Sequence, residues 1–86
     1  MKYIMVSALW CPACIITNNA MDKLVEEKHI DVTRLDYDFD DISEYNVGRT
    51  LPEIIAFKDD KEIGRIIGEK NYNELLMEID KYEENN

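Results

Sequence analysis

The first forty residues carry a strand pattern, a helix pattern and a second strand pattern, in that order. Residues 2–9 form a short, mostly apolar run that is typical of a buried strand. Pro12 suits the first turn of a helix. The apolar stripe of this helix is then Ile15, Ile16, Met21, Leu24 and Val25. Within residues 31–40, apolar and acidic residues alternate with a period of two, which predicts another strand. A strand–helix–strand unit predicts two parallel strands joined by a right-handed crossover.

The second half of the chain predicts an antiparallel hairpin followed by a helix. The runs 53–58 and 62–67 flank a short polar stretch, residues 59–61, which is the pattern of a hairpin. Asn71 and Glu74 then form a capping-box-like helix start. The apolar face of this last helix holds Tyr72, Leu75, Leu76 and Ile79.

A further short helix is expected between the two halves. Asp40 or Asp41 can cap it, it would run through Tyr45, and Gly48 would end it. The predicted order is therefore β-α-β-α-β-β-α. We predict one α/β domain over residues 1–86, a four-stranded mixed sheet with helices on both faces.

Acidic residues outnumber basic ones, 19 Asp and Glu against 10 Lys and Arg, so the formal net charge is −9. A field this negative repels phosphate, and we expect neither nucleic acid nor a membrane as a partner. Residues 3–21 carry no charge, but Trp10, Pro12 and the polar residues after them interrupt the run. It predicts neither a cleaved signal nor a membrane span. We expect a cytoplasmic protein that acts as a monomer.

The only two cysteines, Cys11 and Cys14, stand three positions apart at the predicted junction of strand and helix. Two thiols are too few for a disulfide-built scaffold, and with only His29 in addition the chain cannot form a four-ligand zinc site alone. Unpaired N–H groups at the helix start should favour the thiolate of Cys11. Cys14, nearly one turn later, could attack a mixed disulfide on Cys11. The alternative is that two small apolar residues simply begin a buried helix. Trp10 before the pair and Pro12 within it favour the redox interpretation.

Other polar residues have simpler interpretations. His29, at a helix end, is expected to be a partner of the helix dipole rather than a base. The carboxylates of residues 36–41 could suggest a cation site, but a calcium loop needs a glycine within its acidic run and this run has none. We interpret them as the polar face of a strand.

The sequence resembles the thioredoxin superfamily over nearly its whole length. Residues 10–14, WCPAC, resemble the family's W-C-x-x-C active site, and residues 50–52, TLP, resemble its cis-proline loop. Residues 57–62 and 65–68 are similar to its final hairpin and the glycine that ends it. The compact start is more similar to glutaredoxins and short archaeal-type thioredoxins.

The resemblance implies the roles of individual residues. Cys11 would be the nucleophile, Cys14 the resolving cysteine and Pro52 a cis residue that faces them, while Trp10 would flank the substrate groove. The implied substrate-binding residues are Trp10, Pro12, Ala13, Thr50, Leu51 and Pro52. The backbone of Leu51 could then pair with an extended substrate segment.

Three departures from the family bear on the chemistry. Pro12-Ala13 is closer to the Pro-x order of glutaredoxins than to the Gly-Pro of thioredoxins, and it supplies no cation. Met5 stands where thioredoxins keep a buried aspartate that relays a proton to the resolving cysteine. Water or a carboxylate of Asp36 or Asp38 could take that role. Residues 68–70, GEK, do not match the glutathione-binding stretch of glutaredoxins.

We therefore predict a dithiol–disulfide oxidoreductase that reduces protein or small-molecule disulfides, a reductant or mild exchanger in electron transport and redox homeostasis. It would need no bound cofactor, because the Cys11–Cys14 disulfide is its redox group. A thioredoxin-reductase-like partner or a thiol would re-reduce it. The alternatives are a non-catalytic adaptor of the same fold and a glutathione-dependent glutaredoxin.

Overall fold

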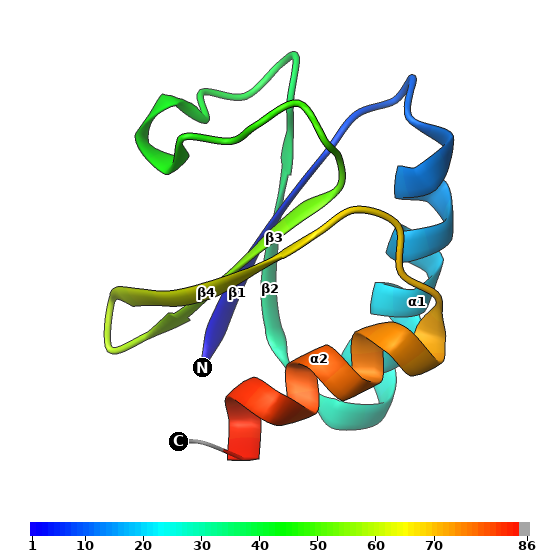
Figure 1. Ribbon diagram of the computed structural model, residues 1–86, viewed down its shortest axis with the longest axis vertical. Helices are drawn as coiled ribbons and strands as arrows, with labels where there is room; N and C mark the ends of the chain where they lie inside the picture. Colours follow the sequence, from blue (N-terminus) through cyan, green and yellow to red (C-terminus); the bar gives the residue numbers. More distant parts are fainter. Residues whose placement is uncertain (85–86) are drawn as a thin grey trace.

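Four strands and three helical segments follow one another in the computed structural model, which describes residues 1–84 (Figure 1). The strands are β1 (Lys2–Ser7), β2 (Asp31–Asp36), β3 (Glu53–Lys58) and β4 (Lys61–Ile67). The α-helices are α1 (Pro12–Lys28) and α2 (Tyr72–Glu84), and η1 (Ser43–Tyr45) is a single 3-10 turn.

The strands form one mixed sheet in the order β2-β1-β3-β4. β1 runs parallel to β2, as the strand–helix–strand pattern predicted, and β3 is antiparallel to both β1 and β4. The loop between β3 and β4 contains only Asp59 and Asp60, both with positive φ. It is one residue shorter than predicted, because Lys61 already pairs with Lys58. The four-stranded mixed sheet and its hairpin are confirmed.

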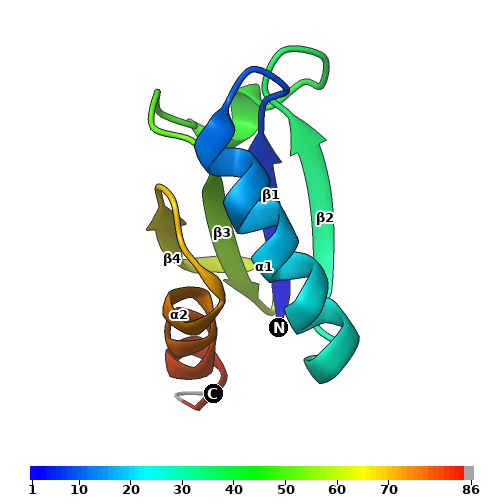
Figure 2. The ribbon, with the colours of Figure 1, turned by 90° about the vertical axis from the view of Figure 1, so that its right-hand side faces the viewer.

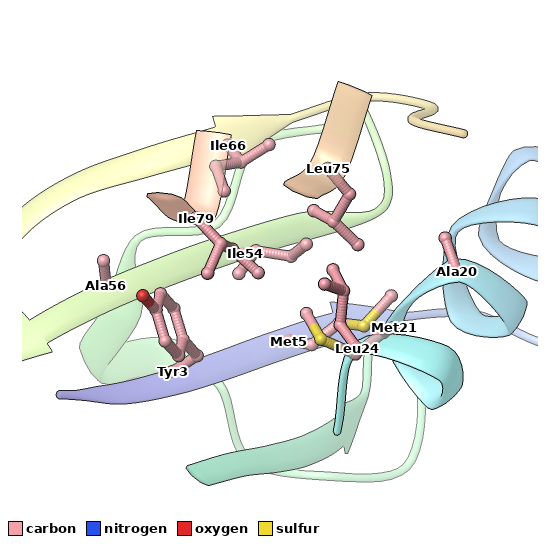
Figure 3. Packing of buried hydrophobic residues seen from close by; sticks show 10 residues of the cluster. All are labelled: Tyr3, Met5, Ala20, Met21, Leu24, Ile54, Ala56, Ile66, Leu75 and Ile79. Atoms are coloured by element: carbon pink, nitrogen blue, oxygen red, sulfur yellow. The ribbon is translucent and has the colours of Figure 1, made fainter. Parts of the chain in front are cut away.

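Both α-helices pack on the same face of the sheet (Figure 2). Alternate residues of the strands point toward them, Tyr3 and Met5 from β1 and Ile54 and Ala56 from β3 (Figure 3). The helices and β4 complete this main core with Ala20, Met21, Leu24, Ile66, Leu75 and Ile79. Side-chain contacts such as that of Lys28 with Asp80 join the outer surfaces of α1 and α2.

The buried face of α1 differs from the predicted stripe at its start. Cys14, Thr17, Ala20, Met21 and Leu24 are buried. Their spacing of three or four residues defines a face that excludes Ile15 and Ile16, and these two side chains are exposed. The predicted stripe is therefore wrong for Ile15 and Ile16 and right for Met21 and Leu24.

The opposite face of the sheet is covered mainly by the connection between β2 and β3, which contains η1 (Figure 1). The predicted helix through Tyr45 is thus a single turn, which Asn46 ends in the left-handed conformation, two residues before Gly48. The N-cap of η1 is Ile42, without a side-chain cap, and not Asp40 or Asp41 as predicted, although the Asp41 carboxylate accepts from the N–H of Ser43. Helical cover on this face is consequently limited to one 3-10 turn.

β2 ends at Asp36 and does not continue to residue 40 as predicted. The Asp36 carboxylate accepts hydrogen bonds from the N–H groups of Asp38 and Phe39, and the Asp40 carboxylate accepts one from the N–H of Asp36. Backbone donors that would continue a strand are used in a turn instead. The alternating aspartates are therefore turn-forming residues, not the polar face of a strand.

The predicted ends of the α-helices agree with the structure. Asn71 Oδ1 accepts from the N–H of Glu74, and the Glu74 carboxylate accepts from the N–H of Asn71, so the capping box at the start of α2 is confirmed. His29 is the C-cap of α1. It adopts a left-handed conformation, and its backbone N–H donates to the Val25 carbonyl.

Candidate active site

Cys11 caps the N-terminus of α1. Its backbone is extended, and its Sγ accepts a hydrogen bond from the N–H of Cys14 at 3.2 Å. Pro12 at the next position has no N–H of its own, so the free donor that reaches the sulfur comes from the first helical turn. The placement predicted from sequence, a sulfur at the positive end of a helix, is the one observed.

Cys14 is almost completely buried, and it lies next to Cys11. Both are free thiols in the structure. Burial raises the pKa of the Cys14 thiol to about 11, and the hydrogen bond with Cys11 adds to the increase. Cys14 is therefore an uncharged thiol at neutral pH, shielded from solvent behind Cys11.

The segment before β3 borders the cysteines on the other side. The peptide bond between Leu51 and Pro52 is cis, the geometry that the resemblance implied. The Cys11 thiol donates to the Leu51 carbonyl at 3.7 Å, and the Pro52 carbonyl accepts from the N–H of Gly68 at 2.9 Å. Leu51 also packs with both cysteines in a second buried cluster, which Val6 and Ala8 complete. Residues forty positions apart thus meet at the sulfur of Cys11.

Trp10 lies beside the cysteines with 60% of its surface exposed. Its Nε1–H donates to Asp38 at 2.6 Å, and its ring packs edge-on against Tyr37. The sequence pattern placed Tyr37 and Asp38 in a strand, suggested Asp38 only as a possible proton relay, and gave Tyr37 no role in the site. No sequence signal pairs Trp10 with a residue 28 positions away, because the contact depends on where β2 ends.

The remaining predicted site residues surround these groups. Pro12 is exposed and Ala13 is half-buried on the first turn of α1, and Thr50 is exposed at the end of the β2–β3 connection. Leu9, 81% exposed, extends the apolar surface next to Trp10 along the chain. These residues belong to two segments of the chain, residues 9–14 and 50–52, which meet where the Cys11 thiol donates to the Leu51 carbonyl.

Thr17 connects the first turns of α1 to the loop after β4. This side chain is fully buried on α1, and its hydroxyl donates to the Ala13 carbonyl and accepts from the N–H of Lys70. The bond connects the helix that carries the cysteines with the loop that follows β4. Sequence analysis missed Thr17, because a threonine within a helix gives no signal of such a link.

Comparison with known proteins identifies the family. No protein-family model matches the chain. A thioredoxin of Chlamydia trachomatis is 30% identical to it over 79 residues, which cover 88% of this chain and 76% of the relative. The chain belongs to the thioredoxin family. This thioredoxin-family protein is accordingly a thiol–disulfide oxidoreductase.

Other thioredoxins are similar in sequence or structure. A thioredoxin of Mycobacterium bovis is 31% identical over 75 residues, or 84% of this chain and 65% of the relative. The structure of thioredoxin-2 of the malaria parasite superimposes with a TM-score of 0.73 at 27% identity, over 93% of this chain and 81% of the other. Thioredoxin 1 of Thermosipho africanus, at 20% identity, has a TM-score of 0.77 over 98% and 96% of the two chains and shows the shared fold.

Met5 is fully buried in the main core, so an apolar side chain occupies the position at which the resemblance implied a proton-relaying aspartate. Burial and the neighbouring Cys11 raise the pKa of Cys14, and a hydrogen bond with the Ala8 backbone lowers it. Within residues 1–84, no carboxylate shifts this pKa. Asp36 and Asp38, the carboxylates considered from sequence, are engaged with backbone N–H groups and with Trp10.

Within residues 1–84, no group of three or more His, Cys, Asp or Glu side chains is arranged to hold a metal ion. No helix in that part of the chain is long and apolar enough to cross a membrane.

Proposed function

We propose that this protein reduces disulfides through a mixed disulfide on Cys11 that Cys14 resolves. The Cys11 thiolate attacks one sulfur of the substrate disulfide, which forms a bond between Cys11 and the substrate and releases the first substrate thiolate. Cys14, as a thiolate, then attacks the Cys11 sulfur, which forms the Cys11–Cys14 disulfide and releases the second substrate thiolate. Solvent protonates both, and two electrons pass from the dithiol to the substrate.

The observation that carries this proposal is the hydrogen bond from the Cys14 N–H to Cys11 Sγ at the helix start. A helix N-terminus favours negative charge, so it favours the sulfur that attacks. The burial of Cys14 supports the opposite role for this residue, because a thiol with a pKa of about 11 is a poor nucleophile until a substrate is attached next to it.

The proposed substrate surface consists of Trp10, Pro12, Ala13, Thr50, Leu51 and Pro52. Two features support it. Trp10 is exposed beside Cys11, and the backbone of Leu51 contacts the sulfur directly. An extended substrate segment could lie between them and pair with the backbone of Leu51.

The electron source in this proposal is a thioredoxin-reductase-like partner or a low-molecular-weight thiol, and no bound cofactor is needed. Cysteines that serve an exchange reaction suit a reducing compartment, which favours the cytoplasm. A monomer suffices, since both cysteines come from one chain.

Reduction of insulin with dithiothreitol as electron donor tests this proposal. We expect Cys11→Ser to abolish turnover. Cys14→Ser, mixed with insulin in the absence of dithiothreitol, should carry out the first step only, so that a stable mixed disulfide accumulates. Wild-type activity that requires glutathione would favour a glutaredoxin instead. Insulin binding or reduction that neither substitution alters would favour an adaptor.

A further inference from the structure

A buried ion pair lies directly after the Leu51–Pro52 segment. Glu53, the first residue of β3, is 3% exposed and is the only charged residue that is fully buried within residues 1–84. In the sheet it stands between Val6 of β1 and Ile67 of β4. A carboxylate in such a position is costly unless it is paired and hydrogen-bonded.

The carboxylate of Glu53 joins two parts of the chain. Oε2 accepts from Arg65 Nη1 on β4 at 2.5 Å, and Oε1 accepts from the N–H of Gly48 at 3.2 Å. The same Nη1 lies 3.5 Å from the Asn46 carbonyl. Glu53 and Arg65 together therefore tie residues 46–48 to the sheet.

The bond between Glu53 and Gly48 links the two ends of a short segment that contains Leu51, the residue that contacts Cys11. The backbone of Glu53 is fixed in the sheet and its side chain holds Gly48, so residues 48–53 form a closed segment. Leu51, whose carbonyl accepts from the Cys11 thiol, lies within this segment. Its path depends on both ends of the segment.

Stability alone is a weak reason for such a pair. Replacing a buried ion pair by apolar residues is often neutral or stabilising, so the pair is better explained by what it orients. The third partner of the cluster, Glu62, binds Arg65 from the exposed surface and makes no hydrogen bond or ion pair with residues 46–51. Glu62 thus offers a matched comparison.

We propose that Glu53 and Arg65 are positioning residues that hold residues 46–51, so that the backbone of Leu51 can receive an extended protein substrate beside Cys11. The inference rests on the proposed function. Loss of the ion pair should weaken the binding of substrates that pair with the Leu51 backbone. It should not change the reactivity of Cys11 itself.

The experiment compares Glu53→Gln with Glu62→Gln in the full chain. For Glu53→Gln we expect the KM for insulin to rise about tenfold and the exchange of the Gly48 amide hydrogen to accelerate about tenfold, because a charge-assisted bond is replaced by a neutral one. The rate of Cys11 alkylation and the reduction of hydroxyethyl disulfide should stay within about twofold of wild type. Glu62→Gln should leave all four quantities near wild type.

Two results would overturn the inference. The first is a KM for insulin that is the same in Glu53→Gln and Glu62→Gln. The second is a loss of activity in Glu53→Gln that is equal for insulin and for hydroxyethyl disulfide, because such a loss would indicate a purely structural role. If Glu53→Gln does not fold, the neutral pair Glu53→Gln/Arg65→Gln replaces it with the same expectations. Failure of the proposed function is distinguishable, because wild type would then leave insulin oxidised as well.

Discussion

The two cysteines lie in the same buried cluster, but their side chains make different contacts. Cys11 Sγ accepts an N–H bond at the start of a helix and donates to the Leu51 carbonyl, whereas burial raises the pKa of the Cys14 thiol. Within residues 1–84, no carboxylate shifts the pKa of Cys14, and Met5, buried in the main core, offers no group that could take its proton. Release of product therefore depends on how a buried thiol loses its proton.

The resolving step should accelerate with pH. The pKa of the Cys14 thiol is raised to about 11, so its thiolate fraction grows about tenfold per pH unit throughout the range below that value. Stopped-flow release of a small thiol from its mixed disulfide with Cys11 measures this rate between about pH 6 and 9. Cys14→Ser should release nothing. A rate that is constant across this range would indicate an internal base and contradict the prediction.

Tyr3 gives a second prediction for a single residue. It is fully buried in the main core, and within residues 1–84 its hydroxyl has no hydrogen-bond partner. A buried hydroxyl without a partner costs about 1–3 kcal/mol, so Tyr3→Phe should leave the free energy of unfolding unchanged or raise it. Urea denaturation measures the change. Tyr72→Phe, which removes a surface bond to Glu27, is the control and should shift stability by less than about 1 kcal/mol. A loss above about 1 kcal/mol in Tyr3→Phe would show that the hydroxyl is paired.

Among the elements, β4 and α2 meet at a contact that only glycine allows. A Cβ on Gly64 would lie 2.3 Å from the hydroxyl oxygen of Tyr82 and 2.7 Å from its ring. The tyrosine ring thus packs directly on the backbone of the edge strand, and its hydroxyl bonds to the Arg65 carbonyl. Docking of α2 depends on the missing side chain at this position.

Gly64→Ala should therefore destabilise the protein by about 1–3 kcal/mol, the usual result of overpacking. Thermal or urea unfolding measures it. Gly48→Ala is the matched control, since a Cβ there would meet only the Glu53 carboxylate at an ordinary 3.9 Å. The second substitution Tyr82→Leu should recover part of the loss by vacating the space. Equal stability of the two alanine variants would contradict this account.

The elements also differ in how far the sequence predicts them. β1, the hairpin and both α-helices follow from local periodicity and caps such as Asn71 with Glu74. The connection between β2 and β3 does not, because side chains decide its path: Asp36 ends the strand early, and Glu53 binds Gly48 and Arg65. The cysteine pair was predictable from a motif, whereas pairs such as Trp10 with Asp38 require the tertiary structure.

For the whole molecule, charge is the dominant property. The net charge is −9, and the acidic turn after β2 places Asp38 directly against Trp10 at the site. A disulfide that approaches Cys11 therefore meets a negative field. Cationic substrates should be attracted and anionic ones repelled.

The dependence of disulfide reduction rates on ionic strength should measure the effect of this negative field. The second-order rate for cystamine, a cationic disulfide, should fall by about tenfold as ionic strength rises from about 0.01 to 0.5 M, because salt screens the attraction. The rate for oxidised glutathione, which is anionic, should rise over the same range, and that for neutral hydroxyethyl disulfide should stay constant. Rates for all three that respond to salt alike would contradict the prediction.

The two faces of the sheet are covered in different ways, one by a pair of α-helices and the other by a connection with a single 3-10 turn. The helical side carries the main core, whereas residues 37–47 supply only partly buried side chains, Tyr37, Ile42 and Val47, to the cluster around the cysteines. That stretch supplies Tyr37 and Asp38 beside the reactive sulfur. Changing the charge of exposed residues in this stretch, such as Asp38, would therefore alter which disulfides approach Cys11 while the helical core stayed the same.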